Sequence, residues 1–290
     1  MSYVNEEIAS QPQCWAQAAD LAAGQAEALP AAGERVAVVG CGTSWFMAQA
    51  YAELREAGGH GETDAFAASQ MPRSRRYDRV VAITRSGTTS EVCELLRELD
   101  TPSTAIVGEG GTPATELATH SVVMPFADEK SVVQTRYATS ALALLRAHLG
   151  EDLTGVIADA TTAVNIDLPV DVATLEQVTF LGDGWTVGLA HEAGLKMREA
   201  ATFWTESYPA MEYRHGPISI TGPNRVAWMF GEAPEGLADD VTRTGGRLVT
   251  SSLDPMADLV VAQRLAVAMA EHRGLDPDQP RHLSRSVILK

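Results

Sequence analysis

Five hydroxyl side chains and a glycine lie within ten residues in the segment ITRSGTTSEV, which spans 83–92. The hydroxyls belong to Thr84, Ser86, Thr88, Thr89 and Ser90. The segment follows the apolar run RVVA and precedes the helical pattern EVCELLREL. Because one such residue is enough to cap a helix, five favour a second task. We expect them to bind a small anion such as phosphate, together with N–H groups at a helix N-terminus.

A second group of chemically active residues lies further along the chain. Glu192, Lys196 and Glu199 are spaced by four and three residues, which places them on one face of a predicted helix. On an exposed helix they would be a solvated ion pair, but small and apolar residues surround them, and buried carboxylates are suited to proton transfer. His215 follows in YRHGPISI, where proline ends a helix. From such a turn an imidazole can reach into a cleft, although a lone histidine is also a common surface group.

The elements that must position these residues repeat along the chain. RVAVVGCGTSW and QVTFLGDGWTV each predict a strand, a Gly-x-Gly turn and a helix start. The expected strands are Val36–Val39, Val80–Thr84, Thr104–Val107, Ser121–Met124, Val178–Leu181, Arg225–Phe230 and Arg247–Thr250. Strands that alternate with helical segments indicate parallel sheets. We therefore predict an α/β protein with two similar doubly wound subdomains.

The predicted domain plan has three parts. An N-terminal helical segment covers 1–30, a first domain covers 31–160, and a second domain with a C-terminal tail covers 161–290. The segment GGHGETDAFAASQ is expected to be a loop, and long helices are expected at Thr139–Leu149 and Met256–Arg273.

Bulk composition excludes several classes of partner. The chain has 290 residues, of which 45% are hydrophobic and 21% charged, and its formal net charge is −16. Without a basic face, such a charge argues against nucleic acid and against anionic membrane surfaces. The three cysteines form no disulfide framework or metal pair, and no signal peptide or apolar run of about 18 residues is present. We expect a cytoplasmic protein.

Competing ligand sites fit the motifs less well. A dinucleotide fingerprint would need a third glycine where GCGTSW has Trp45, and no Gly-x-x-x-x-Gly-Lys-Ser/Thr loop is present. His191 has no partner at metal-ligand spacing. The sequence therefore predicts neither a cofactor nor a metal.

Four motifs, taken in order, resemble the sugar isomerase (SIS) domain family. They are GCGTSW, ITRSGTTSEV, HEAGLKMREAATFWTESYPAMEYRHGP and LDPDQPRHLSRSVILK. The likeness is to the isomerase half of glucosamine-6-phosphate synthase and to its stand-alone relatives, and it covers nearly the whole chain. It implies two flavodoxin-like, three-layer αβα SIS domains, a phosphosugar ligand and a homodimer with shared active sites.

The resemblance also implies roles for individual residues. Glu199 falls on the catalytic glutamate, Glu192 and Lys196 on supporting positions, and His215 on the ring-opening histidine, which the neighbouring subunit can supply. Expected substrate-binding residues are Gly42, Thr43, Ser44, Thr84, Arg85, Ser86, Gly87, Thr89, Val133 and Arg285. A carboxylate and an imidazole match the chemistry, since aldose–ketose exchange moves a proton between adjacent carbons and ring opening needs a second acid–base group.

Two departures from the family pattern shape the expected activity. The sequence has no glutaminase domain, and Cys14 is not the N-terminal cysteine of such a domain, so glutamine-dependent synthesis is not expected. Arg285 takes the place of a lysine that forms a substrate imine, and arginine is a poor amine nucleophile. We expect an isomerase or deaminase of a hexose or aminohexose 6-phosphate. A fructosamine-6-phosphate deglycase and a non-catalytic sugar-phosphate sensor are the alternatives.

Overall fold

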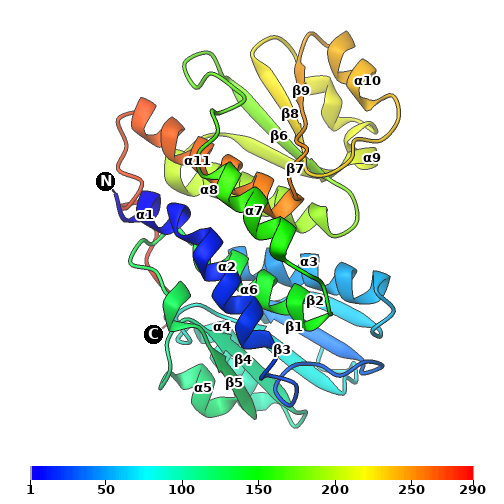
Figure 1. Ribbon diagram of the computed structural model, residues 1–290, viewed down its shortest axis with the longest axis vertical. Coiled ribbons are helices and arrows are strands. Elements are labelled where there is room, and N and C mark those ends of the chain that lie inside the picture. Colours follow the sequence, from blue (N-terminus) through cyan, green and yellow to red (C-terminus); the bar gives the residue numbers. More distant parts are fainter. Residues whose placement is uncertain (1, 290) are drawn as a thin grey trace. The chain divides into compact units, whose positions relative to one another are not determined.

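The chain forms two compact units in the computed structural model, which describes residues 2–289 (Figure 1). The first unit comprises Ser10–Leu153 with Ser284–Lys290, and the second comprises Met1–Ala9 with Thr154–Leu283. The expected boundary at 160/161 thus falls inside helix α7 (Thr154–Ala163). The predicted N-terminal segment is helical but divided, since α1 (Tyr3–Ala9) belongs to the second unit and α2 (Gln11–Ala22) to the first.

The first unit is built on a five-stranded parallel sheet in the order β2-β1-β3-β4-β5. Its strands are β1 (Val36–Gly40), β2 (Thr63–Ala67), β3 (Arg79–Ile83), β4 (Ser103–Val107) and β5 (His120–Val123). Its further helices are α3 (Thr43–Ala57), η1 (Ala68–Gln70), α4 (Ser90–Glu98), α5 (Pro113–Leu117), η2 (Pro125–Ala127) and α6 (Arg136–His148). Helices α4 and α5 cover one face, while α3 and α6 cover the other, with α2 packed on α6. Right-handed crossovers that leave β1 and β3 in opposite directions produce this arrangement.

The second unit repeats the plan with four parallel strands in the order β7-β6-β8-β9. Its strands are β6 (Gln177–Gly182), β7 (Thr205–Pro209), β8 (Arg225–Met229) and β9 (Arg247–Val249). Its further helices are α8 (Thr186–Ala201), α9 (Ala210–Tyr213), η3 (Pro217–Ile220), α10 (Leu237–Arg243) and α11 (Pro255–His272). The predicted α/β class with two doubly wound parallel sheets is therefore confirmed.

Both Gly-x-Gly turns are explained by the same two constraints. A Cβ on Gly40 would lie 2.6 Å from the backbone carbon of Ser44, and one on Gly182 would lie 2.4 Å from that of Thr186, because each helix start presses on the strand end. The second glycines, Gly42 and Gly184, have φ values of +55° and +50°, which other residues rarely adopt.

One prediction of the local structure was wrong. The expected loop GGHGETDAFAASQ contains β2, which pairs only with β1 and is mostly half-buried. Strand β7, which the sequence did not indicate, has the same edge position and the same burial pattern in the second sheet. Edge strands bury fewer side chains, so their hydrophobic pattern is weaker than that of β1, which is buried at every position.

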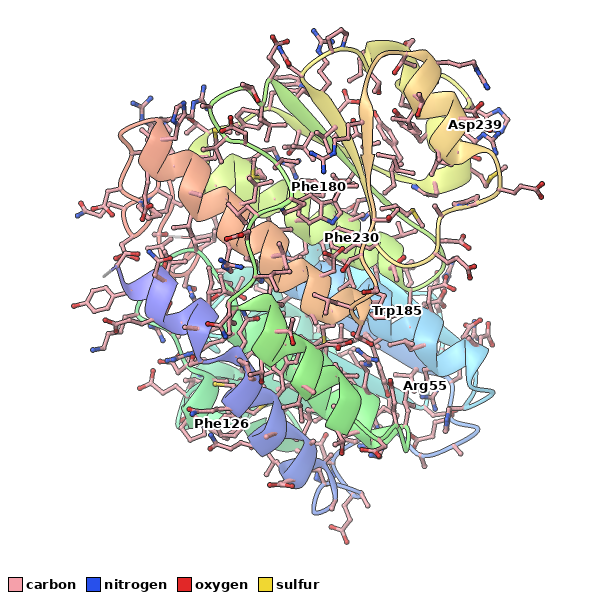
Figure 2. All side chains as sticks on the ribbon, turned by 45° about the horizontal axis from the view of Figure 1, so that its top comes forward. Arg55, Phe126, Phe180, Trp185, Phe230 and Asp239 are labelled. Carbon is pink, nitrogen blue, oxygen red and sulfur yellow. The ribbon has the colours of Figure 1, made fainter. Side chains whose placement is uncertain are left out.

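A buried carboxyl group lies among aromatic rings in the second unit. Phe180, Trp228 and Phe230 pack together on one face of the sheet, with ring centroids 6.0–6.5 Å apart. Figure 2 labels Phe180 and Phe230. Trp228 Nε1 donates a 2.8 Å hydrogen bond to Asp258 of α11. Burial raises the pKa of Asp258 from 3.8 to about 7, although the hydrogen bond from Trp228 acts in the opposite direction.

Asp258 should make the second unit less stable as the pH rises. Between about pH 4 and pH 7 the unfolded chain has released this proton while the folded chain retains it, so the free energy of unfolding falls through that window, by roughly 3–4 kcal/mol at most. Asp258→Asn should remove this fall in urea titrations at several pH values. The matched control is Asp239→Asn, which changes an exposed carboxylate on α10 (Figure 2). An unchanged pH slope in Asp258→Asn would contradict the assignment.

Candidate functional site

A small pocket lies where the strand order of the first sheet reverses. The connections from β1 and β3 diverge, and this divergence leaves a crevice at the carboxyl ends of the two strands, where α/β sheets commonly bind ligands. The residues that line the pocket are Cys41, Ser44, Ile83, Thr84, Arg85, Ser86, Thr89, Val92, Gln134 and Arg285. The predicted anion-binding loop therefore forms one wall, and the first Gly-x-Gly turn forms another.

The five hydroxyls of the loop divide into two groups. Thr88 Oγ1 lies 3.0 Å from Ser286 Oγ, Ser90 N donates to the carbonyl of Val287, and Ser90 Oγ accepts from Leu289 N. These two residues therefore bind the C-terminal tail. The other three, Thr84, Ser86 and Thr89, line the pocket.

The pocket-lining hydroxyls make few hydrogen bonds within the protein. Thr84 Oγ1 is buried and has no hydrogen-bond partner. Thr89 occupies the N-cap position of α4, yet its side chain makes no capping hydrogen bond. Ser86 Oγ accepts from Thr88 N at 3.2 Å, which leaves its own proton to donate. An unpaired buried hydroxyl costs about 1–3 kcal/mol, so this wall is suited to a ligand with strong acceptors.

Gly87 lets the loop fit against its neighbours. Its φ is +62°, and a Cβ at this position would lie 2.0 Å from Thr112 Oγ1. Only glycine therefore allows the hydroxyls on either side to take these positions.

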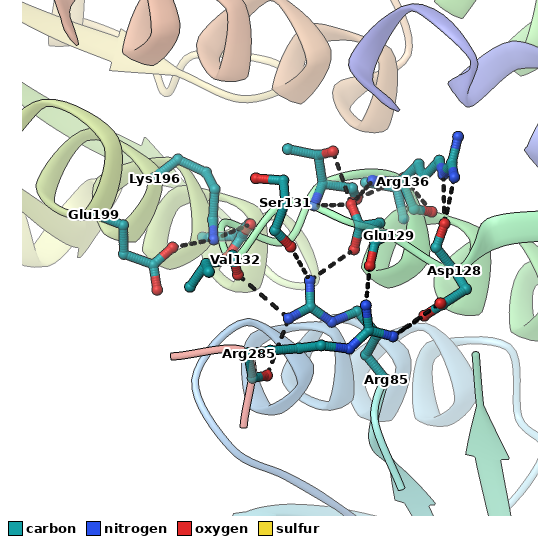
Figure 3. A network of polar contacts seen from close by, with 12 residues as sticks. Arg85, Asp128, Glu129, Ser131, Val132, Arg136, Lys196, Glu199 and Arg285 are labelled. Atoms are coloured by element: carbon teal, nitrogen blue, oxygen red, sulfur yellow. Dashed lines mark hydrogen bonds and ion pairs between the residues drawn. The ribbon is translucent and has the colours of Figure 1, made fainter. Parts of the chain in front are cut away.

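Arg85 is fully enclosed and orders the loops around the pocket (Figure 3). Its guanidinium donates to the carbonyls of Ser131, Val132 and Arg285 at 2.8, 3.3 and 3.0 Å. It also lies 3.5 Å from the buried carboxylate of Glu129. Its Nε is buried without a hydrogen-bond partner, so one charged donor of a pocket-lining residue is unpaired within the protein.

Glu129 anchors the same network. Its Oε1 accepts from the backbone N of Thr135 and Arg136 at 2.6 and 2.9 Å, and from Thr135 Oγ1 at 2.9 Å. These donors belong to the start of α6, where a carboxylate also complements the helix dipole. The buried charge of Arg85 is thus balanced by a carboxylate that is itself held rigidly.

Arg285 is held by a second carboxylate. Its Nη2 lies 2.7 and 2.8 Å from the two oxygens of Asp128, and its Nη1 donates to the carbonyl of Glu129 (Figure 3). The ion pair with Asp128 raises the pKa of Arg285, so the side chain stays charged. Arg285 lines the pocket as a fixed cation.

The charged face of α8 is largely buried. Glu192 and Lys196 are fully buried, and Lys196 Nζ lies 3.5 Å from Glu192 Oε1. Lys196 also donates to Glu199, whose side chain is 19% exposed (Figure 3). Of the two carboxylates on this face, only Glu199 is therefore accessible to a substrate.

His215 lies in a turn directly after α9, where the sequence placed it. Its backbone N donates to the carbonyl of Glu212, and its side chain is exposed. Nearby on α8, His191 is half-buried, and burial followed by the charge of Arg198 lowers its pKa.

In the second sheet, a hydrogen bond spans the switch point, which is the place where the strand order reverses. Thr186, which takes the place of Ser44, donates to the carbonyls of Phe230 and Asp183 at 3.0 and 2.9 Å. Phe230 follows β8 as Thr84 follows β3. The equivalent crevice in the second unit is therefore bridged by the protein, while Ser44 and Thr84 line an open pocket in the first.

The predicted binding residues divide into those that line the pocket and those that do not. The pocket is lined by Ser44, Thr84, Arg85, Ser86, Thr89 and Arg285, but not by Gly42, Thr43, Gly87 or Val133. Val133 is buried, and its neighbour Gln134 lines the pocket instead. The sequence analysis also missed Cys41, Asp128 and Glu129. Asp128, Glu129 and Gln134 lie within six residues of Val133 in the sequence, in the segment ADEKSVVQT.

Cys41 is a neutral part of the lining. Burial, and then the carboxylate of Glu91, raises its pKa to about 11. Within residues 2–289, no group of three or more His, Cys, Asp and Glu side chains is placed to hold a metal ion. None of the described helices is long and apolar enough to cross a membrane.

The chain is similar in sequence to aminotransferases. It is 27% identical to the isomerizing glutamine–fructose-6-phosphate aminotransferase of Sulfurisphaera tokodaii over 89% of this chain and 50% of that protein. The chain thus spans about half the length of the curated relatives that it matches. No protein-family model matches it.

Two solved structures share its fold. Glucosamine-6-phosphate deaminase from Thermotoga maritima has a TM-score of 0.85 and 21% identity, covering 99% of this chain and 100% of that one. The C-terminal domain of glucosamine-fructose-6-phosphate aminotransferase from Francisella tularensis has a TM-score of 0.83 and 20% identity, covering 97% and 98%. At these identities the likeness concerns the fold.

Removing the unpaired hydroxyl of Thr84 should stabilise the ligand-free protein and lower its affinity for an anion. Thr84→Val conserves volume, so we expect the free energy of unfolding to rise by about 1 kcal/mol without ligand, while stabilisation by added phosphate decreases. Denaturant unfolding with and without phosphate measures both effects. Thr186→Val is the matched control, and it should destabilise because it removes a bond that is made. A Thr84→Val protein that keeps the full phosphate response would contradict this assignment.

Proposed function

We propose that the chain is a member of the SIS (sugar isomerase) domain family and that it is a phosphosugar isomerase or deaminase acting on a hexose or aminohexose 6-phosphate, as its similarity to the relatives above supports. The observation that carries the proposal is the switch-point pocket, where the buried hydroxyl of Thr84 and Nε of Arg85 lack partners. A phosphate offers acceptors to both and to the amides at the start of α4.

The face of α8 supports a proton transfer between C1 and C2 of the sugar. Glu199 acts as the base, because it is the accessible carboxylate on that face. Lys196 holds it in place through an ion pair, and Glu192 in turn holds Lys196. Glu192 is fully buried, so it acts through Lys196 as a positioning residue. The proton moves through an enediol or enediolate, as aldose–ketose exchange requires.

The identity of Arg285 points to a reaction without a protein-linked imine. Its guanidinium is paired with Asp128 and remains protonated, so it cannot attack a carbonyl carbon. Isomerisation proceeds by proton transfer alone. Isomerising deamination adds one step, in which water hydrolyses the substrate's own C2 imine to the ketone and ammonia, so neither reaction needs an imine to the protein. Incubation with glucosamine 6-phosphate, glucose 6-phosphate and fructosamine 6-phosphate adducts, with assays for ammonia, fructose 6-phosphate and free amino acid, identifies the reaction. No turnover of any phosphosugar would contradict the proposal.

Replacing the base should stop exchange and leave binding intact. In Glu199→Gln, we expect the rate of deuterium incorporation at the sugar carbon to fall by about 10²–10⁴-fold. Phosphosugar affinity should stay within about twofold, because the amide leaves the phosphate pocket unchanged. NMR in D₂O measures the exchange, and calorimetry measures the affinity. Glu235→Gln, at an exposed position of the same unit, is the control. Exchange at the wild-type rate in Glu199→Gln would remove Glu199 from the mechanism.

We also propose that the protein works as a homodimer in which His215 is supplied to the partner's site. The imidazole is exposed and makes no hydrogen bond or ion pair with another described residue, so it is free to serve a second copy. The second unit also exposes Trp204 by 76% and Met211 by 50%, and such apolar side chains are suited to an interface.

Shared sites would let two inactive variants restore each other. Glu199→Gln and His215→Ala should each be inactive alone in the isomerisation of the cyclic sugar phosphate, because the first lacks the proton transfer and the second lacks ring opening. After mixing and subunit exchange, one of the two sites in each mixed dimer has both wild-type residues, so about a quarter of wild-type activity should return. Mixed dimers that form, as seen by native mass spectrometry, but stay inactive would contradict shared sites.

A further inference from the structure

A second cavity lies at the opposite edge of the second sheet, away from the carboxyl ends of its strands. It has a volume of ≈ 240 Å³ and is enclosed by three segments: the turn before β6, the start of β8 and the start of β9. Its lining residues are Val170, Asp171, Thr174, Leu175, Asn224, Arg225, Val226, Gly245 and Arg247. All of them belong to the second unit, so this cavity is separate from the phosphate pocket of the first unit.

Two arginines stand on neighbouring strands at this cavity. Arg247 pairs in register with Val226, one residue along from Arg225, and both arginines line the cavity at the strand ends. Arg225 is fixed, since its Nη1 donates to the carbonyl of Ile220 at 2.5 Å and its Nε lies 3.8 Å from Glu176. Arg247 makes no side-chain hydrogen bond or ion pair with any residue in the described part of the chain. One guanidinium is therefore pre-positioned and its neighbour is available.

The other polar groups at the cavity are engaged locally. Asp171 is the one carboxylate in the lining, and its Oδ1 accepts from Ala173 N at 2.9 Å. Asn224 donates to Glu176, and Thr174 donates to the carbonyl of Asp171. The lining holds two arginines and one aspartate, and Glu176, outside the lining, pairs with Arg225. Arg247 is therefore the cation that is left for a ligand, within a protein whose net charge is −16.

Between the charged groups the floor is apolar. Val170, Leu175 and Val226 are buried side chains that face the same cavity. Concave sites of this composition, an apolar floor with a few convergent charged groups, are typical of sites for small ligands.

We propose that this cavity binds a small organic anion, with a phosphate or carboxylate head at Arg247 and an apolar body on the floor. Guanidinium groups match such heads because they can donate two parallel hydrogen bonds. The site is distinct from the one under Proposed function, and it would give the second unit a ligand of its own.

NMR titration tests the two pockets separately. Phenyl phosphate carries a phosphate head and an apolar body, benzoate carries a carboxylate head, and inorganic phosphate lacks the body. We expect phenyl phosphate or benzoate to shift the amide signals of Gly245 and Val226, and inorganic phosphate to do so at least about tenfold more weakly. The amide of Gly87 reports the pocket of the first unit independently, so failure at one site is distinguishable from failure at the other.

Arg247→Ala should weaken the response at Gly245 by about tenfold or more, and Arg247→Lys by less. The residue is exposed, so these variants should fold. Arg243→Ala, which removes an equal charge from the exposed face of α10 in the same unit, is the control and should leave the response unchanged. The proposal is overturned if Gly245 does not respond to either organic anion, or if Arg247→Ala and Arg243→Ala respond alike.

Discussion

The organisation of the candidate site depends on a hydrogen bond that the first unit leaves unmade. Where the strand order reverses, the two strand ends must be separated, and the sequence can either bridge the gap or leave it open. In the second unit Thr186 bridges it to Phe230. In the first unit Ser44 and Thr84 stand at the same places, and the buried Thr84 hydroxyl has no partner. Such a group is costly on its own, so its retention makes sense when a ligand completes it.

The overall charge of the protein makes this local chemistry decisive. A chain with a net charge of −16 does not attract an anion through its long-range field. The pocket instead has Arg85, whose buried charge is balanced by the carboxylate of Glu129. The hydroxyls of Thr84, Ser86 and Thr89 also line it. Because Glu129 is fixed by the start of α6, Arg85 does not have to reorganise when a ligand arrives.

The sequence was informative where burial or backbone geometry is strict. Central strands such as β1 and β3 are nearly continuous apolar runs, and the Gly-x-Gly turns follow from close approach, so both could be predicted. Edge strands β2 and β7 could not, because only half of their surface is buried. The sequence also did not indicate which of the loop hydroxyls line the pocket and which bind the C-terminal tail. Thr88 and Ser90 bind the tail at Ser286 and beyond, and a contact so distant in sequence leaves no local pattern.

The repeat also bears on the charged residues of α8. Counting from the two Gly-x-Gly turns, Glu192, Lys196 and Glu199 correspond to Ala50, Leu54 and Ala57 of α3. The same fold therefore accommodates small and apolar side chains at these positions.

Burying an ion pair is commonly no more stabilising than well-packed apolar residues, and removing one partner is strongly destabilising. If these positions served stability alone, α8 could carry small and apolar side chains there, as α3 does. The second unit instead retains Lys196 between two carboxylates, one fully buried and one accessible. The first unit, in turn, retains unpaired hydroxyls that the second has bridged. Each half of the repeat thus bears the cost of one polar feature that the other half shows to be dispensable for folding, and the proposed function assigns a task to both.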